Sequence, residues 1–214
     1  MEQPNINDRL FVEADGTEHN YASINRSKGI RNEKGMFFII EGYREASFHL
    51  LNELINNHKD DWLKIDSFIY PILFTFRHYL EVIIKDTTRY HRMIRREVYS
   101  DQVGFKNDHS LSKLWNELRP YLEATYRDSE DLEDKLTAIE KLLAEFDDKD
   151  KGSYSFRYPF ESSRSIDADI QFALPHISLD LKNLQMIFQK LSYYFDSINE
   201  HALIILDDVT SIME

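Results

Sequence analysis

Apolar residues return every three or four positions in five stretches of the chain, which is the period of an amphipathic α-helix. The stretches cover residues 36–57, 66–90, 108–126, 131–146 and 177–207. The second stretch is apolar nearly all round, which is typical of a helix at the centre of a bundle. The pattern therefore predicts an all-α protein, an antiparallel bundle of about five helices.

Residues that can cap a helix stand near the predicted starts. Asp66 or Ser67 would cap the second helix, and Pro71 would then lie in its first turn, where proline is tolerated. Asp108 or Ser110 would cap the third helix. These boundaries rest on side chains that can accept hydrogen bonds from the free amides of a first helical turn.

The beginning of the chain has a different pattern. Residues 9–24 contain two short extended pieces on either side of Asp15-Gly16, a dipeptide typical of hairpin turns. We therefore expect a small N-terminal β-hairpin. This divides the chain into an N-terminal extension, residues 1–35, and a helical domain, residues 36–214.

Composition narrows the class of protein. The 214 residues include no Cys, which excludes disulfides, thiolate zinc sites, iron–sulfur clusters and thiol catalysis. The net charge of -12 means that any RNA binding must come from a local basic patch. No apolar stretch approaches the roughly 20 residues of a membrane span, and the polar N-terminus does not resemble a signal peptide. We therefore expect a cytoplasmic protein that does not enter a membrane.

The second helix carries a few charges in an otherwise apolar sequence. Arg77, Glu81 and Lys85 recur at every fourth position and so share one face, with His78 beside them. A charge brought into a bundle core costs several kcal/mol unless it is paired. Two interpretations follow: an ion-pair network that sets the register of the helices, or a polar pocket for a phosphate or nucleotide.

Residues from other parts of the chain are candidates to complete this cluster. One is His109, and another is Arg157, which stands between Phe156 and Tyr158. Pro159 favours an extended backbone before it, and alternation along an extended chain would send the two aromatic rings to one side. We therefore expect the rings to anchor the segment on the bundle and Arg157 to point toward the cluster.

A basic stretch follows the cluster at residues 85–97, with five bases and two acids. Tyr90 and His91 are interleaved with Arg89 and Arg92, a pattern that also occurs where proteins contact phosphates or RNA. The alternative interpretation is a solvated helix end, because basic residues at a helix C-terminus interact favourably with the macrodipole.

Metal chemistry receives little support. Glu41, Glu45 and His49 would align on one face of the first helix, but a di-iron bundle repeats a Glu-x-x-His motif on two helices, and no such repeat is present. There is also no Gly-rich phosphate loop. We therefore predict no metal and no cofactor.

Several short motifs together resemble a known group. In chain order they are GYREA at 42–46, YPIL at 70–73, RHYLE at 77–81 with Lys85, HSL at 109–111, LW at 114–115, FRYP at 156–159 and the long helix around 184–195. In this combination the chain resembles bacterial helical proteins related to the HEPN superfamily. The resemblance covers about residues 36–200 and leaves out the N-terminal extension.

The resemblance implies a helical bundle that often dimerises and takes part in toxin–antitoxin or antiphage systems. Active HEPN proteins are metal-independent ribonucleases whose motif is Arg, four to six residues, then His. Arg44 and His49 match that spacing, although five positions on an ideal helix separate two side chains by about 140°. A homodimer is also favoured by the 13% aromatic content, which exceeds the needs of one small core.

Two functions of different classes follow. In the first, a HEPN-like defence or toxin–antitoxin protein acts on RNA or senses a nucleotide. Its site residues would be Arg77, His78, Glu81, Lys85, His109 and Arg157, with Arg89 and Arg92 as further phosphate contacts. In the second, the same residues are structural and the protein is a non-catalytic module that binds a partner protein.

Overall fold

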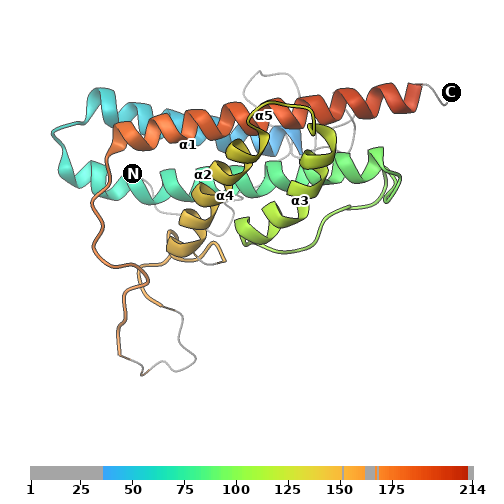
Figure 1. The fold of residues 1–214 in the computed structure, drawn as a ribbon. Coiled ribbons are helices and arrows are strands. Elements are labelled where there is room, and N and C mark those ends of the chain that lie inside the picture. The colour runs from blue at the N-terminus through green and yellow to red at the C-terminus, as the bar shows by residue number, and fades with distance from the viewer. Residues whose placement is uncertain (1–35, 151, 162–166, 168, 212–214) are drawn as a thin grey trace, which may run out of the picture. The chain divides into compact units, whose positions relative to one another are not determined.

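The computed structural model of the chain describes residues 36–150, 152–161, 167 and 169–211. Its helices are α1 (Phe37–Asn57), α2 (Trp62–Ile94), α3 (Leu111–Thr125), α4 (Leu132–Lys149) and α5 (Leu181–Ser211) (Figure 1). Within the described ranges no strand forms, so the prediction of an all-α bundle of five helices is confirmed. The hairpin expected at residues 9–24 lies outside the described residues.

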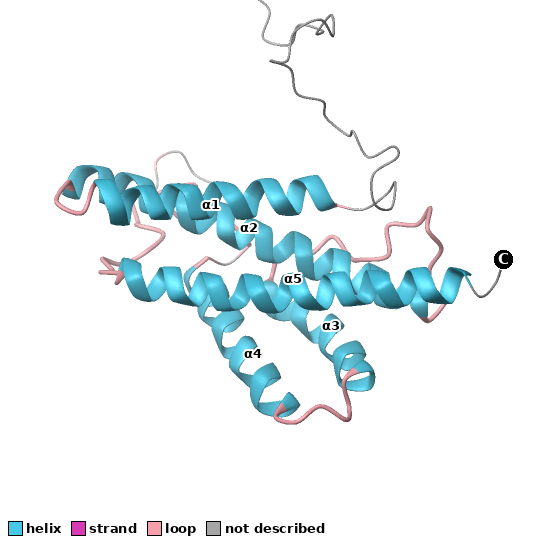
Figure 2. Cartoon of the chain, turned by 90° about the horizontal axis from the view of Figure 1, so that it is seen from above, coloured by secondary structure: helices cyan, strands magenta, loops and turns pink. Residues whose placement is uncertain are grey.

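Helix α2 is the centre of the bundle and packs against α1, α3 and α5. Figure 2 shows α1, α2 and α5 running alongside one another, while α3 and α4 form a V that projects to one side. Leu80 and Ile84 of α2 are fully buried and Phe74 is half-buried, as the apolar pattern of this helix predicts. The position of α2 explains why its few charged side chains meet residues from several other helices.

Aromatic rings fill the core between the long helices. The rings of Phe76 on α2 and Phe188 on α5 stack with centroids 3.5 Å apart, and both side chains are fully buried. Phe48 from α1 and Phe146 from α4 pack around this pair. Four helices therefore meet at one aromatic cluster, where each ring contributes a large apolar area.

Two helix starts differ from the predicted ones. Helix α2 begins at Trp62 because Asp61 caps it: Oδ1 of Asp61 accepts a hydrogen bond from the Lys64 amide at 3.1 Å. The predicted cap at Asp66 or Ser67 is therefore wrong, and Pro71 lies inside the helix. Pro71 is on the exposed face, where water can satisfy the carbonyl that loses its amide partner.

Helix α5 begins four residues later than its apolar pattern indicates. Oδ1 of Asp180 accepts hydrogen bonds from the amides of Lys182 and Asn183 at 2.9 and 3.1 Å, so the first turn starts at Leu181 instead of residue 177. Of the two caps predicted for α3, Asp108 or Ser110, the structure has Ser110, whose hydroxyl accepts a hydrogen bond from the Lys113 amide. A capping side chain thus overrides apolar periodicity at a helix start.

Gly104 is required by the loop that follows α2. Its φ is +72°, and a Cβ there would lie 2.9 Å from Cγ of Arg89, a buried side chain that is itself bonded to the loop. We expect Gly104→Ala to lower the free energy of unfolding by roughly 1–3 kcal/mol in urea denaturation. Gly152→Ala is the matched control, because Gly152 has φ +71° but open space around it. Equal losses in the two variants would contradict the steric argument.

Candidate functional site

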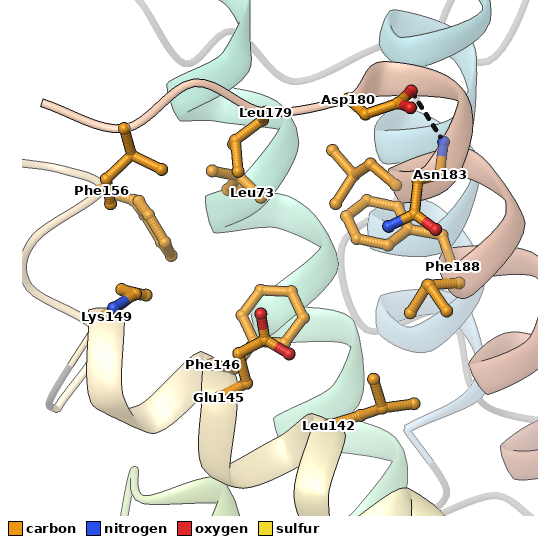
Figure 3. Close-up of a pocket in the computed structure, with 13 residues that line it drawn as sticks. Leu73, Leu142, Glu145, Phe146, Lys149, Phe156, Leu179, Asp180, Asn183 and Phe188 are labelled. Carbon is orange, nitrogen blue, oxygen red and sulfur yellow. Dashed lines mark hydrogen bonds between the residues drawn. The ribbon is translucent and has the colours of Figure 1, made fainter.

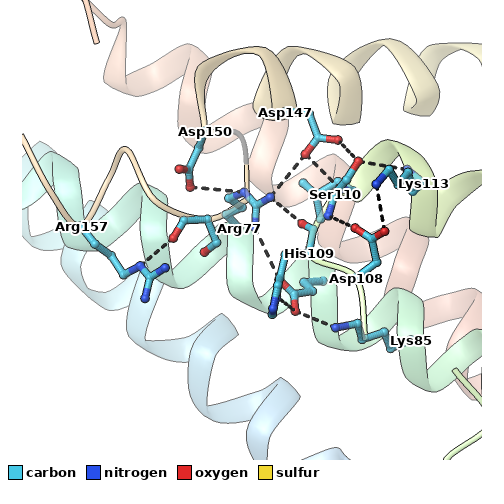
Figure 4. A network of polar contacts seen from close by, with 12 residues as sticks. Arg77, Lys85, Asp108, His109, Ser110, Lys113, Asp147, Asp150 and Arg157 are labelled. Atoms are coloured by element: carbon cyan, nitrogen blue, oxygen red, sulfur yellow. Dashed lines mark hydrogen bonds and ion pairs between the residues drawn. The ribbon is translucent and has the colours of Figure 1, made fainter. Parts of the chain in front are cut away.

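Arg77 lies at the centre of a buried polar network (Figure 4). Its Nη1 is 3.5 Å from Glu81 Oε2, and its Nη2 is 3.3 Å from Asp147 Oδ1. Its Nε is 3.3 Å from Asp150 Oδ2, an ion pair whose geometry does not make a hydrogen bond. Nη2 also donates to the backbone carbonyl of His109 at 2.7 Å. One guanidinium thus joins α2, the start of α3 and the end of α4.

Glu81 connects this network to an exposed histidine. Its Oε1 accepts a hydrogen bond from Lys85 Nζ at 2.8 Å and lies 2.9 Å from His109 Nδ1. The carboxylate is almost completely buried, whereas the His109 side chain is 54% exposed. Because an ionised carboxylate only accepts hydrogen bonds, His109 Nδ1 is the donor in this contact, and Nε2 is the ring nitrogen that is not bonded to Glu81.

Asp147 caps α3 from a different helix. Its carboxylate accepts hydrogen bonds from the Ser110 hydroxyl at 2.7 Å and from the amides of Leu111 and Ser112 at 3.0 and 2.8 Å. Burial alone would raise the pKa of Asp147, but the hydrogen bonds from Ser112, Ser110 and Leu111 outweigh it and lower that pKa below its usual value. Asp147 therefore stays ionised and fixes α3 against α4.

Carboxylates outnumber the cations in the network by one. Arg77 and Lys85 face three carboxylates, those of Glu81, Asp147 and Asp150, which leaves one negative charge more than positive. Arg77 has no exposed surface. Its guanidinium is therefore enclosed by carboxylates, and its contacts are those of a residue that holds three helices in register.

Other predicted residues lie in a row of aromatic and basic side chains beside the network. The ring of His78 lies 4.4 Å from that of Tyr43 on α1 and stacks on Phe74 at 6.2 Å. The guanidinium of Arg157 lies over Phe74 at 5.6 Å and over Tyr158 at 5.7 Å. The structure thus brings His78 and Arg157 together through one shared ring.

The electrostatic surroundings of His78 favour its neutral form. Burial is the largest cause that lowers the pKa of His78, and the charges of Lys85, Arg77 and His109 act in the same direction against Glu81. The charges of the network therefore interact electrostatically with the imidazole of His78. It is half-buried, so part of its ring is accessible.

The segment that carries Arg157 is a turn, not the extended chain predicted. The amides of Arg157 and Tyr158 both donate to the Tyr154 carbonyl, at 3.0 and 3.1 Å. Phe156 is buried as expected, but Tyr158 is 50% exposed, because the turn removes the alternation of an extended chain. Nε of Arg157 donates to the Ser153 carbonyl at 2.6 Å. Within the described part of the chain no carboxylate pairs with Arg157, and its side chain is exposed.

Arg89 and Arg92 hold the loop that follows α2. Arg89 is buried and donates to the carbonyls of Ser100 and Gln102 at 2.7 and 3.1 Å. Arg92 donates to the carbonyl of Gly104 at 2.9 Å. The guanidinium groups of Arg89 and Arg92 therefore bind acceptors within the protein, and the buried Arg89 cannot reach a phosphate from solvent.

His91 in the same stretch is buried, and its ring stacks near Tyr121. Burial, with a smaller contribution from Arg95, lowers the pKa of His91 to about 4. At neutral pH His91 therefore adds no charge to the basic stretch that the sequence indicates.

Arg44 and His49 are not brought to one site. Arg44 Nη1 donates to Asp196 Oδ2 on α5 at 2.6 Å, and Nη2 donates to Glu41 at 2.7 Å. His49 is exposed on the part of α1 that faces solvent. The contacts of Arg44 pair α1 with α5, as in a structural ion pair.

The sequence pattern does not single out Asp147 and Asp150, because they belong to the acidic stretch 128–150, and such a stretch is typical of a solvated helix face. A signal was present. Leu136 and Leu143 are buried on α4, and Asp147 and Asp150 follow Leu143 at four and seven positions, on the same face. An acidic residue that continues an apolar stripe indicates a buried partner of opposite charge.

The fold and the site define a class: an all-α bundle with a buried ion-pair network that positions an exposed histidine. No protein-family model matches the chain, and no curated protein or solved structure matches it. Among the described residues, no helix has the length and apolar character of a bilayer span, and no group of three His, Asp or Glu side chains is placed to hold a metal ion.

Proposed function

We propose that this chain is a cytoplasmic HEPN-like protein of a defence or toxin–antitoxin type that binds RNA or a nucleotide without a metal ion. The binding surface is formed by His78, His109 and Arg157. The observation that carries the proposal is the pair of Glu81 and His109, in which a buried carboxylate holds one nitrogen of an exposed imidazole at 2.9 Å. The resemblance to HEPN proteins supplies the biological setting.

The arrangement suits proton transfer. With Nδ1 bound to Glu81, Nε2 of His109 is free to accept a proton from a ribose hydroxyl, and the carboxylate stabilises the imidazolium that forms. Arg77 acts here as a positioning residue, because its Nη2 fixes the backbone carbonyl of the same histidine. The ring of His109 is thus held by Glu81 and its backbone carbonyl by Arg77, and both residues belong to one buried network.

Arg157 supplies the exposed positive charge. Its guanidinium rests on Phe74 and Tyr158, and rings of this kind are surfaces on which nucleobases stack. Arginine also matches the geometry of a phosphate group. The basic groups on this surface are few, so binding should be weak and sensitive to salt.

The test uses the full chain and total RNA in EDTA, with binding followed by fluorescence anisotropy of a labelled single strand and cleavage followed on gels. We expect His109→Ala to reduce cleavage by about 100-fold or more while binding persists. Arg157→Ala should weaken binding and lower the slope of log affinity against log salt by about one.

Matched controls replace the same residue types elsewhere. His176→Ala and Arg127→Ala remove exposed side chains that belong neither to the network nor to the proposed surface, and both variants should behave as the native protein. Loss of activity in His49→Ala alone would instead support the Arg44 and His49 pair. Native protein that neither binds nor cleaves RNA, or His109→Ala with unchanged cleavage, contradicts catalysis at this surface.

A second function is favoured by the enclosure of Arg77 and by exposed apolar side chains at the start of α2. Trp62, Leu63 and Tyr70 are 71%, 62% and 47% exposed, and Leu63 and Tyr70 share one face of the helix. In this alternative the network is structural and the chain is a protein–protein interaction module, with homodimerisation as its simplest form. Light scattering that gives twice 25.5 kDa for the native chain and 25.5 kDa for Leu63→Glu, without RNA binding in either, would favour it.

A further inference from the structure

A cavity lies between α2, α4 and the start of α5 (Figure 3). Its volume is about 290 Å³. Most of its walls are apolar, and the segment before α5 closes one side with Ile177 and Leu179. It shares no lining residue with the open depression beside His109.

The floor of this cavity is part of the protein core. Leu73, Phe156 and Phe188 are at most 8% exposed, so the space is bounded by side chains that the fold holds in place. Side chains in cores normally fill such space, and an apolar hollow bounded on several sides is the usual form of a small-molecule site. Three helices and a loop surround it, and this enclosure fits a compact ligand better than an extended peptide.

The opening of the cavity is acidic. Glu145 and Asp180 both line it, and Figure 3 shows them on different elements, Glu145 on α4 and Asp180 before α5, where the Asn183 amide donates to the Asp180 carboxylate. The basic residue at the opening, Lys149, is paired with Asp148 at 2.8 Å. Two carboxylates therefore accompany one lysine at the opening, and the carboxylate of Asp180 also accepts hydrogen bonds from the first turn of α5.

The geometry points to a binding site for a hydrophobic amine, a small molecule with an apolar body and one ammonium group. The apolar body would occupy the space above Phe188 and Leu73, and the ammonium group would lie at the opening beside Glu145. A carboxylate ligand of the same shape would meet like charge there. This site is independent of the proposed function and nothing in its lining depends on His109.

The experiment compares three probes that share an indole body: tryptamine, its alcohol analogue tryptophol and indole-3-acetate. Binding to the full chain is measured by isothermal titration calorimetry at low salt. We expect tryptamine to bind tightest, tryptophol more weakly and indole-3-acetate weakest. Because the acidic residues are exposed, Glu145→Gln should weaken tryptamine by roughly two- to fivefold and leave tryptophol unchanged.

Two further variants make the test decisive. Glu130→Gln removes the same charge from an exposed position outside the cavity and should leave all three affinities unchanged. Ile187→Phe fills the cavity and should abolish binding of all three probes with the helical circular dichroism retained; if it does not fold, the Glu145 comparison decides. No binding of tryptamine at millimolar concentration, equal binding of indole-3-acetate, or equal effects of Glu145→Gln and Glu130→Gln would overturn the proposal.

Discussion

We expect Arg77→Met to lower the free energy of unfolding by roughly 3–5 kcal/mol. Methionine keeps much of the volume of the arginine stem but removes the charge, which leaves Glu81, Asp147 and Asp150 facing one another in a buried site. Removing one partner of a buried ion pair is far more costly than removing the whole pair, because the remaining charge stays desolvated. Urea denaturation at pH 7 measures the loss.

The pH dependence distinguishes this mechanism from simple loss of packing. Without Arg77 the buried carboxylates lose their cation, and burial then favours the protonated form of a carboxyl group. A carboxyl with a raised folded pKa binds protons in the folded state first, so the variant should recover part of its stability between pH 7 and pH 5. The native chain should show no such recovery.

Arg119→Met is the matched control for this prediction. Arg119 also meets three carboxylates, those of Glu123, Glu133 and Glu140, but this cluster lies at the surface. Water solvates those glutamates when the arginine is lost, so the expected cost is below about 1 kcal/mol. Equal losses of unfolding free energy in Arg77→Met and Arg119→Met would show that burial does not determine how much an arginine–carboxylate cluster stabilises the protein.

We expect Phe188→Ala to lower the free energy of unfolding by a similar amount, roughly 3–5 kcal/mol. Phe188 is fully buried and stacks on Phe76, with Phe48 and Phe146 at its edges. Alanine would leave a cavity where α1, α2, α4 and α5 meet, and several backbones would have to move to close it. The unfolding midpoint and its slope in urea measure the loss and test whether the transition stays cooperative.

Tyr193→Ala is the control on the same helix. Tyr193 lies five residues further along α5 and is 79% exposed, so the substitution removes an aromatic ring without opening a cavity. Its effect should stay within about 0.5 kcal/mol. A loss for Phe188→Ala no larger than this would mean that the aromatic cluster does not stabilise the bundle.

The apolar periodicity of the sequence predicts the helices and their packing, but it does not locate the residues at which the helices begin. The all-round apolar pattern of α2 places it at the centre of the bundle, because no face of such a helix can be left to water. Its start was misplaced by four residues, since Asp61 stands outside the apolar stripe that defines the helix in the sequence. Caps depend on a single side chain, and several neighbouring Asp and Ser residues compete for that role.

The candidate site was predicted in part. The spacing of Arg77, Glu81 and Lys85 indicates one face of a helix, and these side chains do pair with one another. The partners from other elements were harder to find. His109 was named as a candidate, but Asp147 and Asp150 were hidden within an acidic stretch, and only the meeting of α4 with α2 gives them a buried cation.

The sequence by itself determined the helical class, the central position of α2 and the presence of charges that must be paired in its core. These follow from local periodicity and from the cost of burying an unpaired charge, which hold in any tertiary arrangement. Only the tertiary structure decided which charges pair, that Arg77 is enclosed and that His109 is exposed. Those outcomes depend on contacts between residues far apart in the sequence, such as Glu81 with His109 at 28 positions and Arg77 with Asp147 at 70 positions, and no local pattern encodes such contacts.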